Sequence, residues 1–270
     1  MILFLRKTWA FMVRDLKTAL SYPLAFLLGL GGIFFSVVMW FFFSRMISGV
    51  GIASLERYGG DYFPFVIVGL ALQNYLAVAM GGLTRSIRES QMLGTLEMLL
   101  SSPTSLPVVI FASSIGPFLV TTLRIAVFFL FALLLGRSFH CSSPAAVVVV
   151  ILLSITSFSA FGIVSAAVIL VLKRGNPFNL LVGASSSLLA GIYYPVEILP
   201  QGLQVAAWFL PVTHSVEALR RIMLTGGGFA AIREQLLWLF LFSAIALPAA
   251  LAVFTMGVRR ARREGTLAHY

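Results

Sequence analysis

Charge is the scarcest property of this chain of 270 residues. Only 10% of its residues are Asp, Glu, Lys or Arg, while 60% are hydrophobic and the mean hydropathy is +1.01. Soluble globular proteins carry about 25% charged residues. The composition therefore excludes an ordinary soluble domain and predicts a polytopic membrane protein.

The sequence is equally short of the residues that enzymes and metal sites use. Cys141 is the single cysteine, which excludes an internal disulfide and a cysteine metal cluster. The three histidines are scattered, and no G-x-x-x-x-G-K-[ST] phosphate loop is present. His214, Ser215 and Glu217 are close in sequence, but adjacency is no evidence of a hydrolytic site. We therefore predict no catalytic residue, no metal and no cofactor bound by this chain.

What the sequence does contain is a series of long apolar runs. They predict an all-α fold with six transmembrane helices, because about 20 apolar residues are needed for one crossing. The predicted spans are 24–43, 62–84, 106–136, 144–172, 177–195 and 235–258. The fifth is marginal, since Gly191 and Pro195 predict an early end. Residues 1–22 are basic and amphipathic, which predicts an interfacial helix ahead of a membrane domain at 23–270.

Basic residues predict the orientation of these spans. With both termini in the cytoplasm, twelve Lys and Arg residues lie inside and six outside, with Arg124 left within a span. This bias follows the positive-inside rule. The net charge of +10 is therefore explained by topology, and we predict no binding of nucleic acid.

The segment 85–103 is the main amphipathic stretch between two spans. Its apolar stripe recurs at helical spacing on Met92, Leu96, Leu99 and Leu100. Such a helix is too polar to cross a bilayer, so we predict that it lies at the cytoplasmic surface. It is either a plain interfacial helix or a docking element for a soluble partner.

The segment 196–234 is apolar in pieces too short to span. Prolines and a run of three glycines at 226–228 interrupt it. We predict short re-entrant helices that dip into the outer leaflet, where irregular backbone must be buried in protein or face a water-filled cavity. The alternative is an ordinary exposed loop.

Polar residues inside the predicted spans are few. Arg124 lies midway along the third span, where a charge is costly and needs a partner. One interpretation is contact with an anionic substrate or a lipid headgroup. The other is structural: Arg124 pairs with Gln73 or Asn74, or its side chain snorkels to the interface. The fourth and fifth spans contain small residues that predict close helix packing; these are Ser154, Ser157, Gly162, Ser165 and Ser185–187.

Two sequence motifs resemble those of ABC-2 type exporter permeases, the transmembrane subunits of ATP-binding-cassette transporters. The first is Gly94-Thr95-Leu96-Glu97 with Ser102-Pro103 after it, which resembles the family signature between spans two and three. The second is Tyr194-Pro195-x-Glu197-x-Leu199-Pro200, followed by Leu210-Pro211-x-Thr213-His214 and Glu217-x-x-Arg220. The resemblance covers nearly the whole chain.

The resemblance implies that this chain borrows its energy from a separate nucleotide-binding ATPase subunit. ATP and Mg would bind to that partner, and a second permease copy would complete a dimer in the cytoplasmic (inner) membrane, in contact with membrane lipids. The segment 85–103 would be the coupling helix. Its implied ATPase-coupling residues are Arg88, Gly94, Thr95 and Glu97.

The resemblance also implies export of a lipid-linked glycan, a lipid or a drug. The residues that we predict on the substrate path or gate are Arg124, Tyr193, Tyr194, Glu197, His214 and Glu217. The aromatic residues near 40–43 and 193–194 suit an amphiphile, and membrane-interface belts explain them equally well. A gradient-driven transporter or channel is the alternative, although no acidic residue lies within a predicted span.

Overall fold

The structure is a computed structural model that describes residues 23–47, 53–92, 106–135, 139–172 and 177–263. Every element within these ranges is helical, which confirms the predicted all-α class. In chain order they are α2 (Pro23–Ile47), η1 (Ala53–Tyr58), α3 (Tyr62–Met92), α5 (Leu106–Leu134), α6 (Pro144–Leu172), α7 (Pro177–Leu189), η2 (Val196–Ile198), α8 (Gln201–Trp208), α9 (Pro211–Leu224), η3 (Phe229–Ile232) and α10 (Arg233–Arg263), where η marks a 3-10 helix. The predicted interfacial helix at 1–22 lies outside the described residues.

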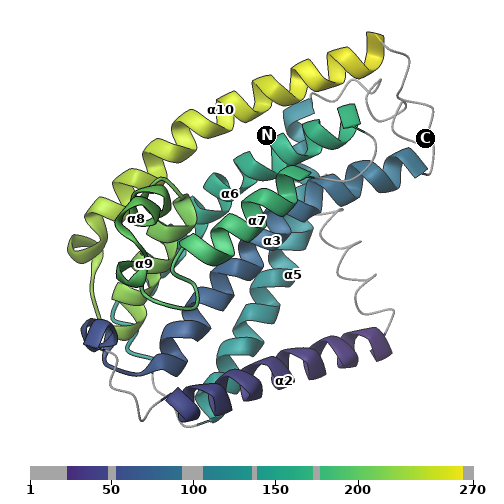
Figure 1. The fold of residues 1–270 in the computed structure, drawn as a ribbon. Helices are drawn as coiled ribbons and strands as arrows, with labels where there is room; N and C mark the ends of the chain where they lie inside the picture. The colour runs from purple at the N-terminus through teal and green to yellow at the C-terminus, as the bar shows by residue number, and fades with distance from the viewer. Residues whose placement is uncertain (1–22, 48–52, 93–105, 136–138, 173–176, 264–270) are drawn as a thin grey trace.

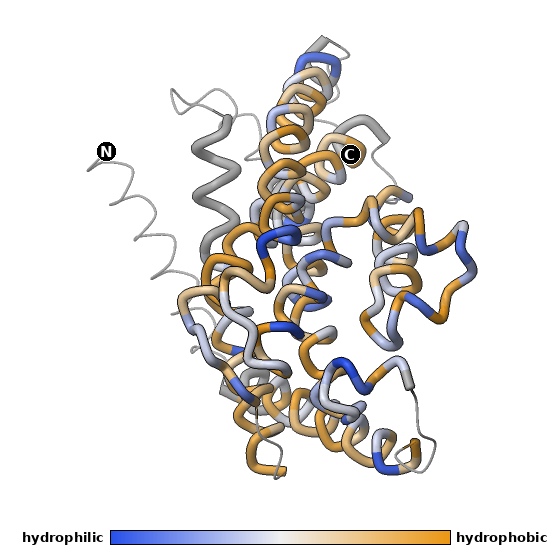
Figure 2. The backbone as a smooth tube through the Cα atoms, turned by 90° about the vertical axis from the view of Figure 1, so that its left-hand side faces the viewer, coloured by the Kyte–Doolittle hydropathy of each residue, from blue (hydrophilic) through white to orange (hydrophobic). Residues whose placement is uncertain are grey.

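Five of the described helices are long and apolar enough to cross a membrane: α2, α3, α5, α6 and α10. Figure 2 shows hydrophobic residues along much of the described backbone. The fifth predicted span forms α7, which has only 13 residues. At 1.5 Å per residue it reaches about 20 Å, less than the roughly 30 Å of a hydrocarbon core. The described part of the chain thus has five helices of spanning length and one short apolar helix where the sequence predicted six spans.

Helix α3 differs from its predicted boundary. The predicted span ended at residue 84, where the charged segment 85–103 begins, but α3 continues without a break to Met92. Residues 85–92 contain neither glycine nor proline, so nothing in the backbone ends the helix there. The first part of the predicted coupling helix is therefore a continuation of α3, and residues 93–105 lie outside the described residues.

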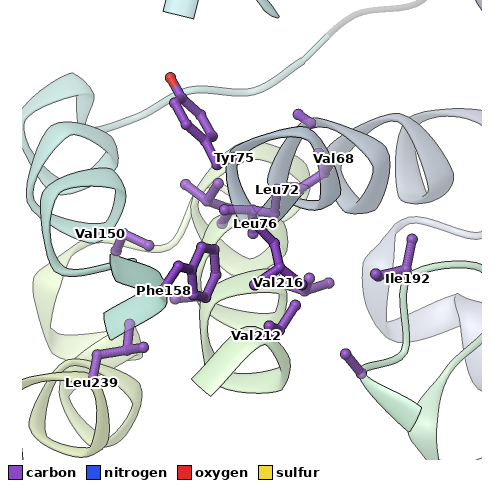
Figure 3. Close-up of a cluster of buried hydrophobic side chains, with 14 of the residues drawn as sticks. Val68, Leu72, Tyr75, Leu76, Val150, Phe158, Ile192, Val212, Val216 and Leu239 are labelled. Carbon is purple, nitrogen blue, oxygen red and sulfur yellow. The ribbon is translucent and has the colours of Figure 1, made fainter. Parts of the chain in front are cut away.

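Helix α3 forms the centre of the bundle. Of its spanning window 72% is buried, against 17% for the windows of α2 and of α10. It packs against α5, α6 and α9, while α2 and α10 lie on opposite edges of the bundle (Figure 1). Figure 3 shows the main core, in which α3, α6, α9 and α10 meet. The labelled core residues include Leu72, Phe158, Val216 and Leu239.

Small residues bring the helices into close contact, as the sequence predicted. A Cβ atom on Gly162 of α6 would lie 2.0 Å from the carbonyl oxygen of Ala79 on α3, so only glycine fits at this crossing. Ser157 of α6 shares a hydrogen bond of 2.8 Å with Ser243 of α10. Apolar helices have no hydrophobic reason to associate in lipid, so close packing and such bonds hold them together.

The segment after α7 is broken into short helices. Gly191 has a φ of +72°, a conformation that side chains disfavour, and it turns the chain out of α7. The elements η2, α8, α9 and η3 then follow before α10. Nine of the 14 residues of α9 are buried. The segment is therefore a packed part of the bundle and not an exposed loop.

Candidate functional site

A cleft of about 300 Å³ lies where η1, η2, α8, α9 and the first turn of α10 meet. These elements gather at one end of the bundle, at the left of Figure 1. Glu197, His214 and Glu217, three of the residues predicted on the substrate path or gate, all line this cleft. The structure thus brings them together from η2 and α9. We call this site the polar cleft.

An ion pair joins two sides of the polar cleft. The Nη2 atom of Arg57 on η1 lies 2.6 Å from Oε1 of Glu197 on η2, across 140 residues of sequence. Both side chains are about half exposed. Exposed pairs of this kind contribute only about 0–1 kcal/mol of stability. The pair is therefore better suited to set the shape of the cleft than to hold the fold.

Glu217 is the most heavily engaged carboxylate in the cleft. It accepts hydrogen bonds from the hydroxyl of Tyr58 and from Nε of Arg221, the latter at 2.8 Å. Burial and the neighbouring Glu217 carboxylate raise the pKa of Tyr58, so the phenol keeps its proton. Arg221 also donates to the carbonyl oxygen of Ala231. This network fixes α9 to η1 and η3.

Arg220, beneath the cleft, is a buried cation that binds backbone carbonyl groups. It is only 2% exposed. Its guanidinium donates to the carbonyl oxygens of Gly191 at 2.7 Å, Ile192 at 3.0 Å and Phe65 at 3.1 Å, and lies 3.3 Å from the centroid of the Phe65 ring. Burial lowers the pKa of Arg220 to about 9, which leaves it charged at neutral pH. Arg220 therefore satisfies the carbonyl groups that the chain exposes after α7 ends.

His214 lies in an aromatic cluster at the same site. Its Nε2 atom is 2.7 Å from the carbonyl oxygen of Trp208, and its ring stacks on Trp238 at 5.8 Å. Trp208 and Trp238 meet edge to face at 4.2 Å. Burial lowers the pKa of His214 below its usual 6.5, so the imidazole is neutral and donates to Trp208. Trp208 is held rigidly but remains 41% exposed on the wall of the cleft.

Two adjacent residues of α10 bring hydrogen-bond acceptors to the cleft. Gln235 is 5% exposed, and its Oε1 atom is buried with no hydrogen-bond partner among the described residues. Glu234 is exposed and makes no hydrogen bond or ion pair within the part of the chain that the structure describes. A buried acceptor without a partner costs about 1–3 kcal/mol. The cleft thus carries acceptors that the protein itself does not satisfy.

The predicted path residues Tyr193 and Tyr194 lie beside the polar cleft and do not line it. The ring of Tyr193 stacks on Trp40 of α2 at 5.5 Å, and its hydroxyl donates to Gln73 of α3 at 3.0 Å. The hydroxyl of Tyr194 donates to the carbonyl oxygen of Leu188. These tyrosines tie the turn after α7 to α2, α3 and α7.

Arg124 lies apart from the polar cleft and from Tyr193 and Tyr194. Its side chain is exposed on α5, and the described residues give it no hydrogen bond or ion pair. The two side chains predicted as pairing candidates bond elsewhere: Gln73 donates to Ser187, and Asn74 donates to the carbonyl oxygen of Leu70. Arg124 therefore points to surroundings that lie outside the described chain.

The remaining sequence predictions have simpler outcomes. Arg88 lies in the last turns of α3, and Gly94, Thr95 and Glu97 lie outside the described residues. Ser215 is fully buried and bonds to Ser154 and to the carbonyl oxygen of Pro211, not to His214. The neighbours in sequence therefore do not form a hydrolytic set.

Most other residues of the polar cleft were not predicted, among them Arg57, Tyr58, Trp208 and Gln235. Arg57 and Tyr58 lie far from α9 in sequence, so no local pattern connects them. Trp208 lies within the predicted re-entrant segment 196–234, and Gln235 follows directly after it. The breaks in that segment are the one signal in the sequence that irregular backbone there lines a cavity.

The family model for the ABC-2 type transporter matches residues 6–224, which is most of the chain. No curated protein matched the chain. The match includes the described elements from α2 to α9, and thus most of the polar cleft.

Proposed function

Because the chain belongs to the ABC-2 type transporter family, we propose that it is the permease subunit of an ATP-driven exporter of an amphiphilic substrate. It is a multi-pass membrane protein, and the matched membrane domain is a permease without a nucleotide-binding domain. Permeases of this type generally pair with an ATPase subunit. The single observation that carries the proposal is the family match over residues 6–224.

Energy would reach the permease through the segment 85–103. In this proposal Arg88, Gly94, Thr95 and Glu97 contact the ATPase, which holds ATP and Mg. The continuity of α3 through Met92 supports a mechanical link, because a continuous helix passes a displacement from its end to the centre of the bundle. The link works only if the ATPase contacts differ between inward-open and outward-open states.

The same proposal assigns an orientation. The charge bias supports an orientation with both termini in the cytoplasm and the polar cleft at the opposite, outer side of the inner membrane. Two copies of the permease form the exporter. The polar cleft then lies where a substrate leaves the transporter, with Glu197, His214 and Glu217 on its walls.

The substrate would be a lipid-linked glycan, a lipid or a drug. Support for an amphiphile comes from two neighbouring environments: a polar cleft at the α9 end, and the aromatic cluster of Trp40 and Tyr193 beside it. The exposed Arg124 on the apolar α5 supports contact with an anionic substrate or lipid headgroup.

A gradient-driven transporter or channel is the competing proposal. It would need ionisable acidic groups within the spans to couple an ion to the substrate. The sequence places none within the predicted spans, which favours the ATP-driven proposal.

The test is co-purification of the chain with a candidate ATPase, followed by ATP hydrolysis of the reconstituted complex. We expect the wild-type chain to bind the ATPase, and we expect the exported substrate to alter the rate of ATP hydrolysis by the complex. Glu97→Arg should weaken the complex or uncouple hydrolysis from the substrate. The matched control is Glu264→Arg, a charge reversal in the tail on the same predicted side. Normal complex and activity with Glu97→Arg would reject the coupling role, and failure of every ATPase to bind would favour the gradient-driven proposal.

A further inference from the structure

The charged groups of the polar cleft are largely engaged with one another. Three arginines and three glutamates line it, so their formal charges cancel. Arg57 pairs with Glu197, Arg221 with Glu217, and Arg220 donates to carbonyl oxygens. None of the three arginines remains free for a phosphate or carboxylate. The cleft therefore offers an anionic ligand no unengaged cation among the described residues.

The unengaged polar groups are acceptors. The buried Oε1 atom of Gln235 has no partner among the described residues, and the neighbouring Glu234 carboxylate makes no bond there. An acceptor is satisfied only by a donor, such as a hydroxyl or an ammonium group. Binding of a donor group would recover the free energy that the protein loses by burying Gln235 without a partner.

The cleft also presents an apolar wall. The indole of Trp208 is 41% exposed and is fixed against Trp238 and His214. A rigid aromatic side chain supplies contact area at a low cost in conformational entropy. A sugar ring matches such a wall, because its C–H groups form apolar faces while its hydroxyls point outward from the rim.

From these observations we propose that the polar cleft binds an uncharged, hydroxyl-rich group, namely a sugar residue of the exported molecule. Trp208 would stack on the ring, and Glu234 and Gln235 would accept hydrogen bonds from its hydroxyls. An ammonium group would also donate hydrogen bonds to these acceptors and make a cation–π contact with the indole. The three nearby arginines oppose a cation, since the cleft as a whole has no net negative charge. This inference rests on the proposed export function in one respect, namely that the bound sugar belongs to the exported molecule.

The test measures binding by the full chain alone, in phosphatidylcholine nanodiscs after purification in a detergent without a sugar headgroup. Saturation-transfer NMR is recorded with methyl glycosides of glucose, galactose, mannose, rhamnose and N-acetylglucosamine, and with choline and inorganic phosphate as charged probes. We expect saturable binding of at least one glycoside and weaker or no binding of the charged probes.

Matched variants place the binding site. Trp208→Ala and Gln235→Leu should each weaken glycoside binding by about tenfold, the loss of one good contact. Leu203→Ala and Gln201→Leu, exposed residues of α8 that do not line the cleft, should stay within about twofold of wild type. Tighter binding of choline or phosphate, absence of glycoside binding, or equal binding by the cleft variants would overturn the inference. Because no ATPase is present, these outcomes are separate from failure of the proposed coupling to an ATPase.

Discussion

Helices α9 and α10 reverse the pattern of a soluble protein. Helix α9 carries His214, Ser215 and Arg220, and all three are buried. Helix α10 is strongly apolar, and many of its large side chains are exposed, such as Leu237 at 59% and Phe240 at 62%. The polar helix thus lies inside the bundle and the apolar helix at its edge.

The solvent explains this difference. A lipid bilayer accepts apolar side chains but satisfies no hydrogen bond, so polar groups and irregular backbone must find their partners inside the protein. The two helices should therefore fail in different ways. Substitutions of the buried polar residues of α9 should leave polar groups unsatisfied, while substitutions of the apolar side chains of α10 should cost only packing.

The largest expected effect comes from Arg220→Met in α9. The variant keeps an apolar stem but leaves the carbonyl oxygens of Gly191 and Ile192 buried without their donor. We expect it to reduce the free energy of unfolding by about 3 kcal/mol. Thermal unfolding in detergent, followed by size-exclusion chromatography, measures the loss. The matched control is Arg233→Met, an exposed arginine at the start of α10, and equal stability of the two variants would contradict the role of Arg220.

A second comparison lies within α10. Leu239 is fully buried in the main core, while Leu237 is 59% exposed. Leu239→Ala should cost about 2 kcal/mol, because it opens a cavity between packed helices. Leu237→Ala should change stability by less than about 0.5 kcal/mol, since a lipid tail replaces the lost contacts. The same unfolding assay tests the pair, and a large loss from Leu237→Ala would show that another chain covers this face.

A smaller effect is expected where α6 meets α10. Ser157→Ala removes the hydrogen bond to Ser243, and bonds between helices in membranes average about 0.6 kcal/mol. The matched control is Ser159→Ala, because the one hydrogen bond of the Ser159 hydroxyl among the described residues goes to the carbonyl oxygen of Ile155 in its own helix. The unfolding temperatures of the two variants are compared. A lower unfolding temperature for Ser159→Ala than for Ser157→Ala would argue against a stabilising contact between the helices.

Much of this fold is accessible from the sequence, because lipid as a solvent imposes a simple pattern. The predicted span 144–172 coincides with α6, since Pro144 begins the apolar run and Lys173 follows its end. Charge alone placed the end of the second span at residue 84. Helix α3 continues through that point because backbone propensity, not charge, decides where a helix ends.

Only part of the polar cleft could be predicted from the sequence. Glu197, His214 and Glu217 were predicted together, because they belong to one motif within a short stretch of chain. Arg57 was not, since its pairing with Glu197 joins residues 140 positions apart. Nothing in a local pattern specifies such a contact, and it arises only when η1 and η2 are placed side by side by the whole bundle.

The smallest expected effect concerns pH and His214 in α9. Its pKa is lowered in the folded protein, chiefly by burial, while the hydrogen bond to Trp208 and the carboxylates of Glu234 and Glu217 oppose the shift. The unfolded chain therefore takes up a proton first as the pH falls through 6.5, and stability falls with it. The stability that neutral His214 provides is fully present above that pH.

The measurement is the unfolding temperature between about pH 7.5 and pH 5.5, a range that brackets the usual histidine pKa of about 6.5. We expect a decline toward pH 5.5 that His214→Gln flattens, since glutamine donates to the Trp208 carbonyl without titrating. His140→Gln serves as the control, because it is the same substitution at an exposed histidine. An unaltered slope in His214→Gln would mean that the buried imidazole carries no net cost of protonation, and that the aromatic cluster of α9 is more accessible to water than the packing of Trp208 and Trp238 around it implies.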